Sequence, residues 1–325
     1  MDEEYYRLVY VFSDLLAPLI VGYFFHREHL VGENLVNMAI RLNVLVIFTV
    51  LSLLSFWVLP LSRELIWIPL FGIMYVLFPG AIGWLTFARR HRDPLDRGAY
   101  LASAMLSNIG TLGGVCAFIL YHEEGFAYAQ MIGICQNVML VLVCFPMAQH
   151  FYSLHRMEQV GAKGVSKKSS RWHSFREMFF SWNQVSLLGM LAGILLNVMG
   201  VSRPESTAEI FSYFVHISAW ISLMPVGFLM DFHRAKAYYG KALDLIFLRF
   251  AIVPAAIWGT TRLVFSDPVL LHSLFICSMA PTAINAVVTA KLYKLNVDFA
   301  VASFILTTGI FLLVLFPGLF FFLRT

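Results

Sequence analysis

Long apolar runs separated by short polar segments make up most of the chain. Each run is close to the roughly 20 residues that a helix needs to cross bilayer hydrocarbon, and the strict alternation of strands is absent. The sequence therefore predicts an all-α polytopic membrane protein with ten transmembrane helices. The predicted spans are 8–25, 34–59, 65–88, 98–121, 125–150, 184–201, 210–233, 242–265, 268–293 and 298–323.

Small and polar residues interrupt two of these runs near their centres. The fourth run contains Ser-Asn-Ile-Gly-Thr-Leu-Gly-Gly at 107–114, and the ninth contains Ala-Pro-Thr-Ala-Ile-Asn-Ala at 280–286. Hydrocarbon cannot solvate free backbone groups, so a broken helix persists only where the break is buried in protein or lines a polar cavity. Two such breaks at corresponding positions of two halves indicate the binding site of a secondary transporter.

The same interruptions relate the halves of the chain. A shift that carries Asn108 onto Asn285 also carries spans one to three onto spans six to eight, and span five onto span ten with a small slip. With five spans each, the halves enter the membrane from opposite sides, which predicts a 5+5 inverted repeat. The alternative is that ten evenly spaced helices align with themselves at many offsets. We predict repeats at 1–150 and 184–325.

A cytoplasmic linker is predicted between the repeats, at 151–183. Residues 161–170 are polar and basic and contain Gly and Ser, which is typical of a flexible segment. Residues 175–182 carry aromatic side chains beside Arg176, and they predict either a short interfacial helix or a plain tether.

Composition agrees with a membrane location and excludes a nucleic-acid-binding role. Hydrophobic residues make up 59% of the chain and charged residues 13%, with mean hydropathy +0.76. The net charge of +4 follows the membrane, because Lys and Arg gather in the loops of one side. The positive-inside rule then places both termini outside. No secretory signal is recognised, so we expect span one to be retained in an integral, multi-pass protein of a bacterial inner (plasma) membrane.

Side chains around the two interruptions form the candidate binding site. Half-helix N-termini carry partial positive charge and free N–H groups, which suit a carboxylate, and asparagine adds donors and acceptors. For each asparagine the other interpretation is a helix–helix contact. The candidate substrate-binding residues are Ser107, Asn108, Gly110, Thr111, Gln136, Asn137, Pro281, Thr282 and Asn285.

These motifs resemble those of the auxin efflux carrier family, the PIN-like transporters. Residues 107–114 are similar to the family's first crossover and 279–290 to its second, and the resemblance extends over the whole chain. One departure is that Val115 and Cys116 follow Gly114, where family members often have a proline. The resemblance also reaches, more loosely, the wider superfamily of bile-acid and arsenite carriers.

The resemblance implies an elevator-type carrier of small organic anions, such as auxin, malate or malonate. Spans 1, 2, 6 and 7 would form the scaffold, and spans 3–5 and 8–10 the moving transport core. Asn108 and Asn285 match the crossover asparagines of the family. The short linker makes the chain more similar to microbial members than to plant auxin carriers. A homodimer is left open.

Charged residues inside the spans are the next candidates. Asp14 in span one is a candidate proton carrier, because intramembrane acids are costly and usually functional. Its other interpretation is an acid that faces the outer vestibule or caps a helix. Arg41 and Arg249 are interpreted as snorkelling to the inner surface, or else as attracting an anion to the inner cavity. His216 and His272 stand alone, so neither metal site nor cofactor is expected.

The predicted function is secondary active transport or uniport of organic anions, driven by protons or by the membrane potential, and not catalysis. A sodium-coupled carrier of the bile-acid type is the first alternative. It is disfavoured because 278–290 contains no Asp or Glu. The second alternative is a membrane sensor with a carrier fold, which is disfavoured because the sequence ends directly after span ten. No ATP-binding loop is present.

Overall fold

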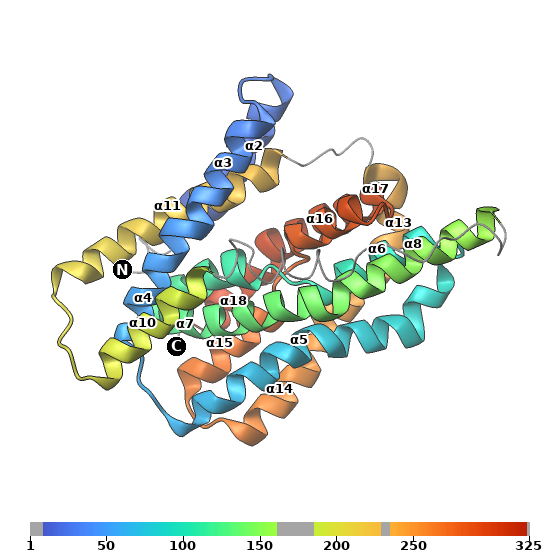
Figure 1. Cartoon of the computed structure of the whole chain (residues 1–325). Helices are drawn as coiled ribbons and strands as arrows, with labels where there is room; N and C mark the ends of the chain where they lie inside the picture. The colour runs from blue at the N-terminus through green and yellow to red at the C-terminus, as the bar shows by residue number, and fades with distance from the viewer. Residues whose placement is uncertain (1–8, 161–184, 229–234, 324–325) are drawn as a thin grey trace.

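The computed structural model describes residues 9–160, 185–228 and 235–323, and nearly all of these residues are helical (Figure 1). Within these ranges the only β-type pairing is a bridge between Ser107 and Thr282. Several helices pass through a wider π turn, where the backbone bonds to the fifth residue instead of the fourth. The predicted all-helical class therefore holds for the described residues.

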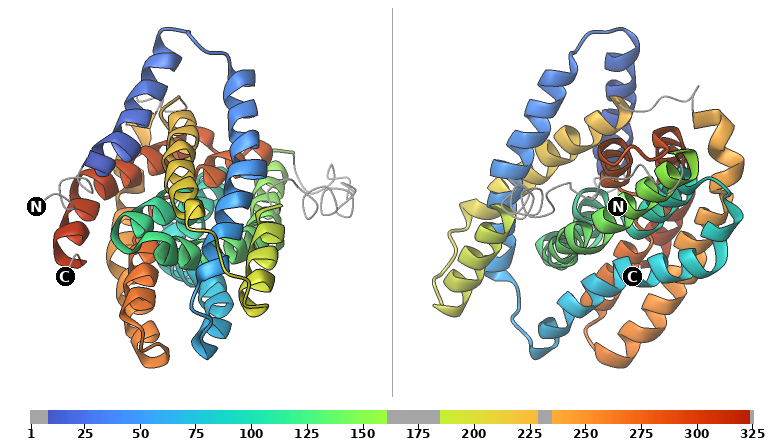
Figure 2. Two further views of the ribbon diagram at one scale, coloured as in Figure 1. Left: turned by 90° about the vertical axis from the view of Figure 1, so that its left-hand side faces the viewer. Right: turned by 45° about the vertical axis from the view of Figure 1, so that its right-hand side comes forward.

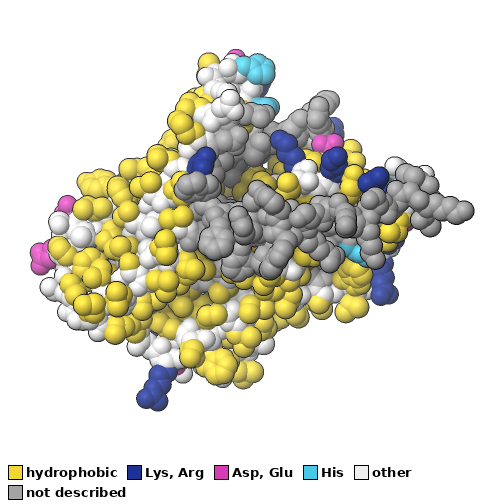
Figure 3. All heavy atoms as spheres, in the orientation of Figure 1, with side chains coloured by type: hydrophobic (Ala, Val, Ile, Leu, Met, Phe, Trp, Pro, Cys, Tyr) yellow, Lys and Arg dark blue, Asp and Glu magenta, His cyan; other side chains and the backbone are white. Residues whose placement is uncertain are grey.

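Apolar side chains cover much of the surface. In Figure 3 they extend over the lower part of the visible face, while Lys, Arg, Asp and Glu lie in its upper part and at its edges. Among the described residues, four helical stretches are long and apolar enough to cross a membrane: Arg63–Arg90, Ile109–Gln159, Lys236–Val264 and Val297–Leu323. Shorter apolar helices lie at Leu45–Val58, Val185–Val198 and Pro268–Ser278.

One group of helices contains the first helices of each half of the chain, which pack against each other. It consists of α2 (Ala17–Arg27), α3 (Glu33–Leu42), α4 (Phe48–Val58), α10 (Val185–Val198) and α11 (Ser206–Phe228). Gly189 and Gly193 of α10 meet the backbone of α4, and Gly22 of α2 meets α11. A Cβ atom at any of these glycines would overlap a carbonyl group, so these crossings depend on small residues as membrane helices often do.

The second group contains the remaining helices, and the two groups lie side by side in Figures 1 and 2. Its members are α5 (Ile68–Ile82), α6 (Pro94–Met105), α7 (Gly114–Met139), α8 (Phe145–Val160), α13 (Tyr239–Phe247), α14 (Val253–Val264), α15 (Pro268–Ser278), α16 (Ile284–Leu292), α17 (Val297–Ile310) and α18 (Phe316–Leu323). Large buried side chains such as Tyr75, Tyr100 and Phe304 fill its centre.

The α7 range consists of two helices that fold back on each other. Tyr121 and His122 leave helical geometry, and His122 has a φ of 51°. A Cβ atom on Gly125 would lie 2.6 Å from the carbonyl oxygen of Ala117, although eight residues of straight helix would separate them by about 12 Å. The chain therefore reverses here, between predicted spans four and five.

Polar pairs join helix ends of the second group near the predicted cytoplasmic side. Arg90 pairs with Asp244 at 2.8 Å, and Lys241 pairs with Asp96 at 2.8 Å. The Asn296 amide donates to the same Asp96 carboxylate at 2.6 Å. These contacts tie the starts of α6, α13 and α17 together.

The first residues of the predicted linker at 151–183 are helical, because helix α8 continues to Val160. The basic segment 161–170 and the interfacial helix or tether predicted at 175–182 lie outside the described residues.

Candidate functional site

The two predicted interruptions are real breaks, and they pair with each other. Helix α6 ends at Met105 and α15 at Ser278, and each chain is extended before the next helix begins. The Asn108 N–H donates to the Pro281 carbonyl at 2.7 Å, and the Ala283 N–H donates to the Leu106 carbonyl at 2.8 Å. We call residues 106–113 and 279–285 the crossover. Each break thus satisfies backbone groups of the other.

Both broken helices begin alike. Asp93 precedes Pro94 and accepts a hydrogen bond from the Leu95 N–H, and Asp267 precedes Pro268 and accepts from the Val269 N–H. Proline suits the first helical position, and an aspartate cap satisfies one of the free N–H groups there. Similar local sequences therefore start two half-helices that run toward the crossover.

Gln136 supports the first break from span five. Its Oε1 accepts from the Ser107 N–H at 3.0 Å, and its Nε2 donates to the Ser107 carbonyl at 2.6 Å. Gln136 is 4% exposed, so these two bonds are shielded from water. The Asn108 carbonyl accepts from the Gly113 N–H at 2.9 Å and closes a π turn, η6 (Ile109–Gly113). Gln136 is thus placed as a support of the backbone.

Gly110 lies where η6 contacts the helix after the reversal. Its carbonyl accepts from Gln130 Nε2 at 2.8 Å. A Cβ atom on Gly133 would lie 3.4 Å from the Gly110 Cα, so the two chains pass close together there. Gly110 is half-buried and its own Cβ position is open, which leaves space beside the start of this half-helix.

The second break is supported from α17. The Thr282 N–H donates to Thr307 Oγ1 at 3.1 Å, and Thr282 Oγ1 donates to the Ser103 carbonyl at 3.1 Å. Thr282 and Thr307 are fully buried, and Pro281 is buried beside them. The Thr282 hydroxyl is therefore committed to the first broken helix.

Two asparagine side chains of the crossover, and Asn137 on α7, keep hydrogen-bonding capacity. Asn108 Oδ1 accepts from the Thr111 hydroxyl, and within the described residues its Nδ2 has no partner. The Asn285 amide and the Asn137 amide, both half-buried, likewise have none in the described part of the chain. Asn108 precedes η6 and Asn285 is in the first turn of α16, so both lie at half-helix N-termini, where the backbone carries partial positive charge.

Arg249 is a residue that sequence reasoning misplaced. It is 1% exposed and does not reach the surface, so snorkelling is wrong for it. Its Nη1 donates to the Ala104 carbonyl at 3.2 Å, and its Nη2 donates to the Leu106 carbonyl at 3.0 Å. Both nitrogens also donate to Ser107 Oγ, at 3.0 and 2.5 Å. Arg41, by contrast, is exposed, in agreement with a position at the surface.

Tyr75 makes a contact that corresponds to that of Arg249, but with the other broken helix. Its hydroxyl donates to the Leu274 carbonyl in α15, the first half of the second broken helix. Span three thus reaches the second broken helix, while span eight reaches the first through Arg249. Tyr75 is fully buried and neutral, so the two contacts differ in charge.

Asp14 lies in η1 (Val11–Leu16), which leads into α2 of the first helix group. It is 4% exposed and pairs with Nδ1 of His216 on α11. The Tyr10 ring lies 4.2 Å from the His216 ring, and Phe118 of α7 lies 6.2 Å from it. The sequence analysis did not predict this pairing with His216. Because 202 positions separate the pair, no local pattern shows it.

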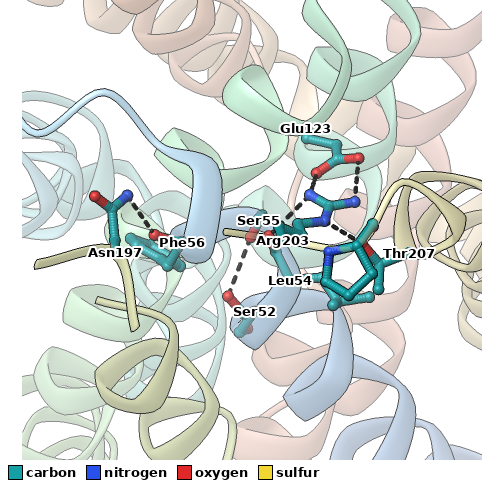
Figure 4. A network of polar contacts seen from close by, with 9 residues as sticks. Ser52, Leu54, Ser55, Phe56, Glu123, Asn197, Arg203 and Thr207 are labelled. Atoms are coloured by element: carbon teal, nitrogen blue, oxygen red, sulfur yellow. Dashed lines mark hydrogen bonds and ion pairs between the residues drawn. The ribbon is translucent and has the colours of Figure 1, made fainter. Parts of the chain in front are cut away.

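A second polar network joins the helix groups (Figure 4). Arg203, in the connection before α11, forms a two-pronged ion pair with Glu123, just after the α7 reversal. Arg203 also donates to the Leu54 carbonyl at 3.2 Å and to Thr207 Oγ1 at 2.5 Å. Asn197 of α10 donates to the Phe56 carbonyl at 3.1 Å. The sequence analysis did not predict this network.

The model of a family described as membrane transport protein matches residues 10–317, which is most of the chain and includes every crossover residue. No curated protein matches the chain.

Proposed function

The chain belongs to the membrane transport protein family, and from that premise we propose that it carries small organic anions through the crossover. The bound carboxylate lies at the N-termini of η6 and α16, within reach of the Asn108 and Asn285 amides. Half-helix N-termini provide N–H groups and partial positive charge, so an anion is the favoured ligand.

The pairing of the two breaks carries this proposal. Breaking two helices deep in apolar protein is costly unless every freed backbone group is satisfied. Here the two backbone bonds between the breaks satisfy several of these groups, and so do the side chains of Gln130, Gln136, Arg249 and Thr307. Within the described residues, Asn108 Nδ2 and the Asn285 amide have no partner. Such an arrangement is difficult to explain as packing alone, because an unbroken apolar helix would need none of it. Pro281, Ser107 and Thr282 then shape the site, and Thr111 orients Asn108.

The architecture we propose is ten spans in two inverted repeats, at 1–150 and 184–325. Three features that occur once in each half support the repeat. Asp93 and Asp267 cap the two broken helices, Tyr75 and Arg249 each reach across to the other one, and positive φ occurs at His122 and Lys294 just after them. With the positive-inside rule, both termini lie outside.

The proposed transport cycle moves the second helix group as a core against the first group as a scaffold. The separation of the two groups in Figures 1 and 2 supports this division. The Arg203–Glu123 pair connects them near the predicted outer ends of the helices, whereas the Lys241–Asp96 and Arg90–Asp244 pairs lie within the core. An elevator movement would break the first pair and keep the others.

Membrane potential is the proposed driving force. Each charge is worth about 2.3 kcal/mol per 100 mV, so an inside-negative potential alone exports an anion. The Asp14–His216 pair is the second candidate, as a proton site between α11 and its neighbours. Sodium coupling is disfavoured because 278–290 contains no acid.

Uptake into proteoliposomes tests the proposal. The purified protein is given labelled malonate, malate, acetate or indole-3-acetate, with pH, sodium and potential gradients imposed one at a time. Saturable flux that is lost in Asn285→Ala supports the carrier and identifies the driving gradient. If no anion moves under any gradient, the proposed function is wrong and a sensor with this fold becomes the better explanation.

A further inference from the structure

Arg249 holds an unusual position, because it is a cation at the centre of the second helix group. It is the largest fully buried side chain of the described residues, and it lies on a π turn, η10 (Leu248–Ile252). An ionised side chain is expensive to bury in a membrane protein and is normally paired or functional. What balances this charge therefore decides what Arg249 does.

No acid balances it in the described part of the chain. The ion pairs there do not include Arg249, and the nearest acid in its own span, Asp244, is paired with Arg90. The segments 98–121 and 268–293, which contain the crossover, have no Asp or Glu. The partners of Arg249 are the carbonyls of Ala104 and Leu106 and the Ser107 hydroxyl, all of them neutral groups.

The helix dipoles do not balance the charge either. The crossover brings together two half-helix C-termini, from α6 and α15, and two N-termini, at η6 and α16. Each end carries about half an elementary charge, negative at C-termini and positive at N-termini, so the four ends cancel. Arg249 leaves the crossover with one positive charge in excess.

We propose that Arg249 determines the charge of the substrate, so that the crossover prefers monocarboxylates over dianions and over neutral amides. A bound monoanion makes the crossover neutral, whereas a dianion leaves a buried negative charge and a neutral ligand leaves Arg249 unbalanced. Arg249 acts as a positioning residue, through its field and through Ser107. This inference rests on the proposed function and deepens it.

A purely structural role predicts something different. As a cap of α6, Arg249 would act through hydrogen bonds alone, as Tyr75 does on α15. The test therefore separates charge from hydrogen bonding. Arg249→Lys and Arg249→Gln both lose the planar fork, and only Lys keeps the charge. Tyr75→Phe removes a hydrogen bond to the second broken helix without changing charge. Arg262→Met removes a cation that lies over the Trp258 ring on α14.

The readout is the KM and kcat of proteoliposome uptake for the monocarboxylate that the wild type carries fastest. Competition by a dicarboxylate and by the neutral amide of that substrate is measured in parallel. We expect KM to rise at least tenfold in Arg249→Gln, to stay within about threefold in Arg249→Lys, and the preference for monoanion over amide to fall tenfold only in the Gln variant. Tyr75→Phe and Arg262→Met should keep the wild-type preference.

Equal KM values and equal selectivity in the Lys and Gln variants would overturn the inference about Arg249. If the wild type still transports the substrate in that experiment, the proposed function is unaffected. If the Gln variant does not fold, Arg249→Lys decides: unchanged monoanion preference supports the charge role, and a lost preference overturns it. Absence of wild-type flux would instead count against the proposed function itself.

Discussion

The two broken helices use the same backbone plan with different chemistry. Each starts with Asp-Pro, each pairs with the other across the crossover, and each is supported by the span that follows it. The first is supported by a carboxamide, from Gln136, and contacts a buried cation, Arg249. The second is supported by a hydroxyl, from Thr307, and contacts only neutral groups among the described residues. Both breaks therefore have side chains that bond to their free backbone groups, but only the first break also has a buried positive charge, that of Arg249.

The largest expected effect is on transport, when the unpaired amides are removed. Asn108→Ala and Asn285→Ala should each lower uptake of the carboxylate by at least tenfold, because each deletes donors at a half-helix N-terminus. Asn108→Ala should be the more severe, since Asn108 lies nearer Ser107 and its bound Arg249. Uptake in proteoliposomes is the measurement, with chromatographic profile as the folding control. Normal uptake by both variants would contradict the assignment of the site.

The next effect is on stability, and it compares the two supports. Gln136→Leu leaves both the N–H and the C=O of Ser107 without partners, at a cost of about 1–3 kcal/mol for each buried group. Thr307→Val leaves only the Thr282 N–H, so it should cost about half as much. Thermal unfolding in detergent measures both. A larger loss in Thr307→Val would reverse the comparison.

A smaller effect is expected at the ion pair between the helix groups. Glu123→Gln removes the charge that holds Arg203, and partly buried pairs of this geometry contribute about 1–3 kcal/mol. We expect the populations of transport states to shift, which is measured as a changed rate of exchange across the membrane. Glu124→Gln is the matched control beside it, because Glu124 contacts Tyr128 and not Arg203. Equal rates in the two variants would exclude a gating role for the pair.

The smallest effect concerns the turns that follow the broken helices. His122 and Lys294 adopt positive φ, at 51° and 54°, which is unfavourable for residues with a side chain. Glycine at either position should stabilise the protein by about 1 kcal/mol. Differential scanning calorimetry of His122→Gly and Lys294→Gly checks this. A loss of stability in both glycine variants would mean that the side chains matter more than the turns.

The breaks themselves were predictable, because Gly110, Pro281 and the two asparagines disrupt apolar runs whose length is fixed by the bilayer. The burial of Arg249 was not predictable, because its depth in span eight fits both a side chain that reaches the surface and one that points to the centre of the protein. The helix reversal at Tyr121 was expected from span lengths alone. Contacts such as Asp14–His216 join residues far apart in the sequence, and no local pattern contains that information.

The bridge at the centre of the crossover also has a consequence for biosynthesis. Ser107 and Thr282 lie 175 positions apart in the sequence, so the first break reaches the membrane before its partner has been translated. At ribosomal speed that interval is on the order of ten seconds. During this interval the Asn108 N–H and the Leu106 carbonyl lack their partners from the second break. Gln136 is only 29 residues after Ser107, so it is translated soon after the first break. The unpaired backbone groups of the first break therefore have to stay out of lipid, in water or in the insertion machinery, until the second half has been inserted.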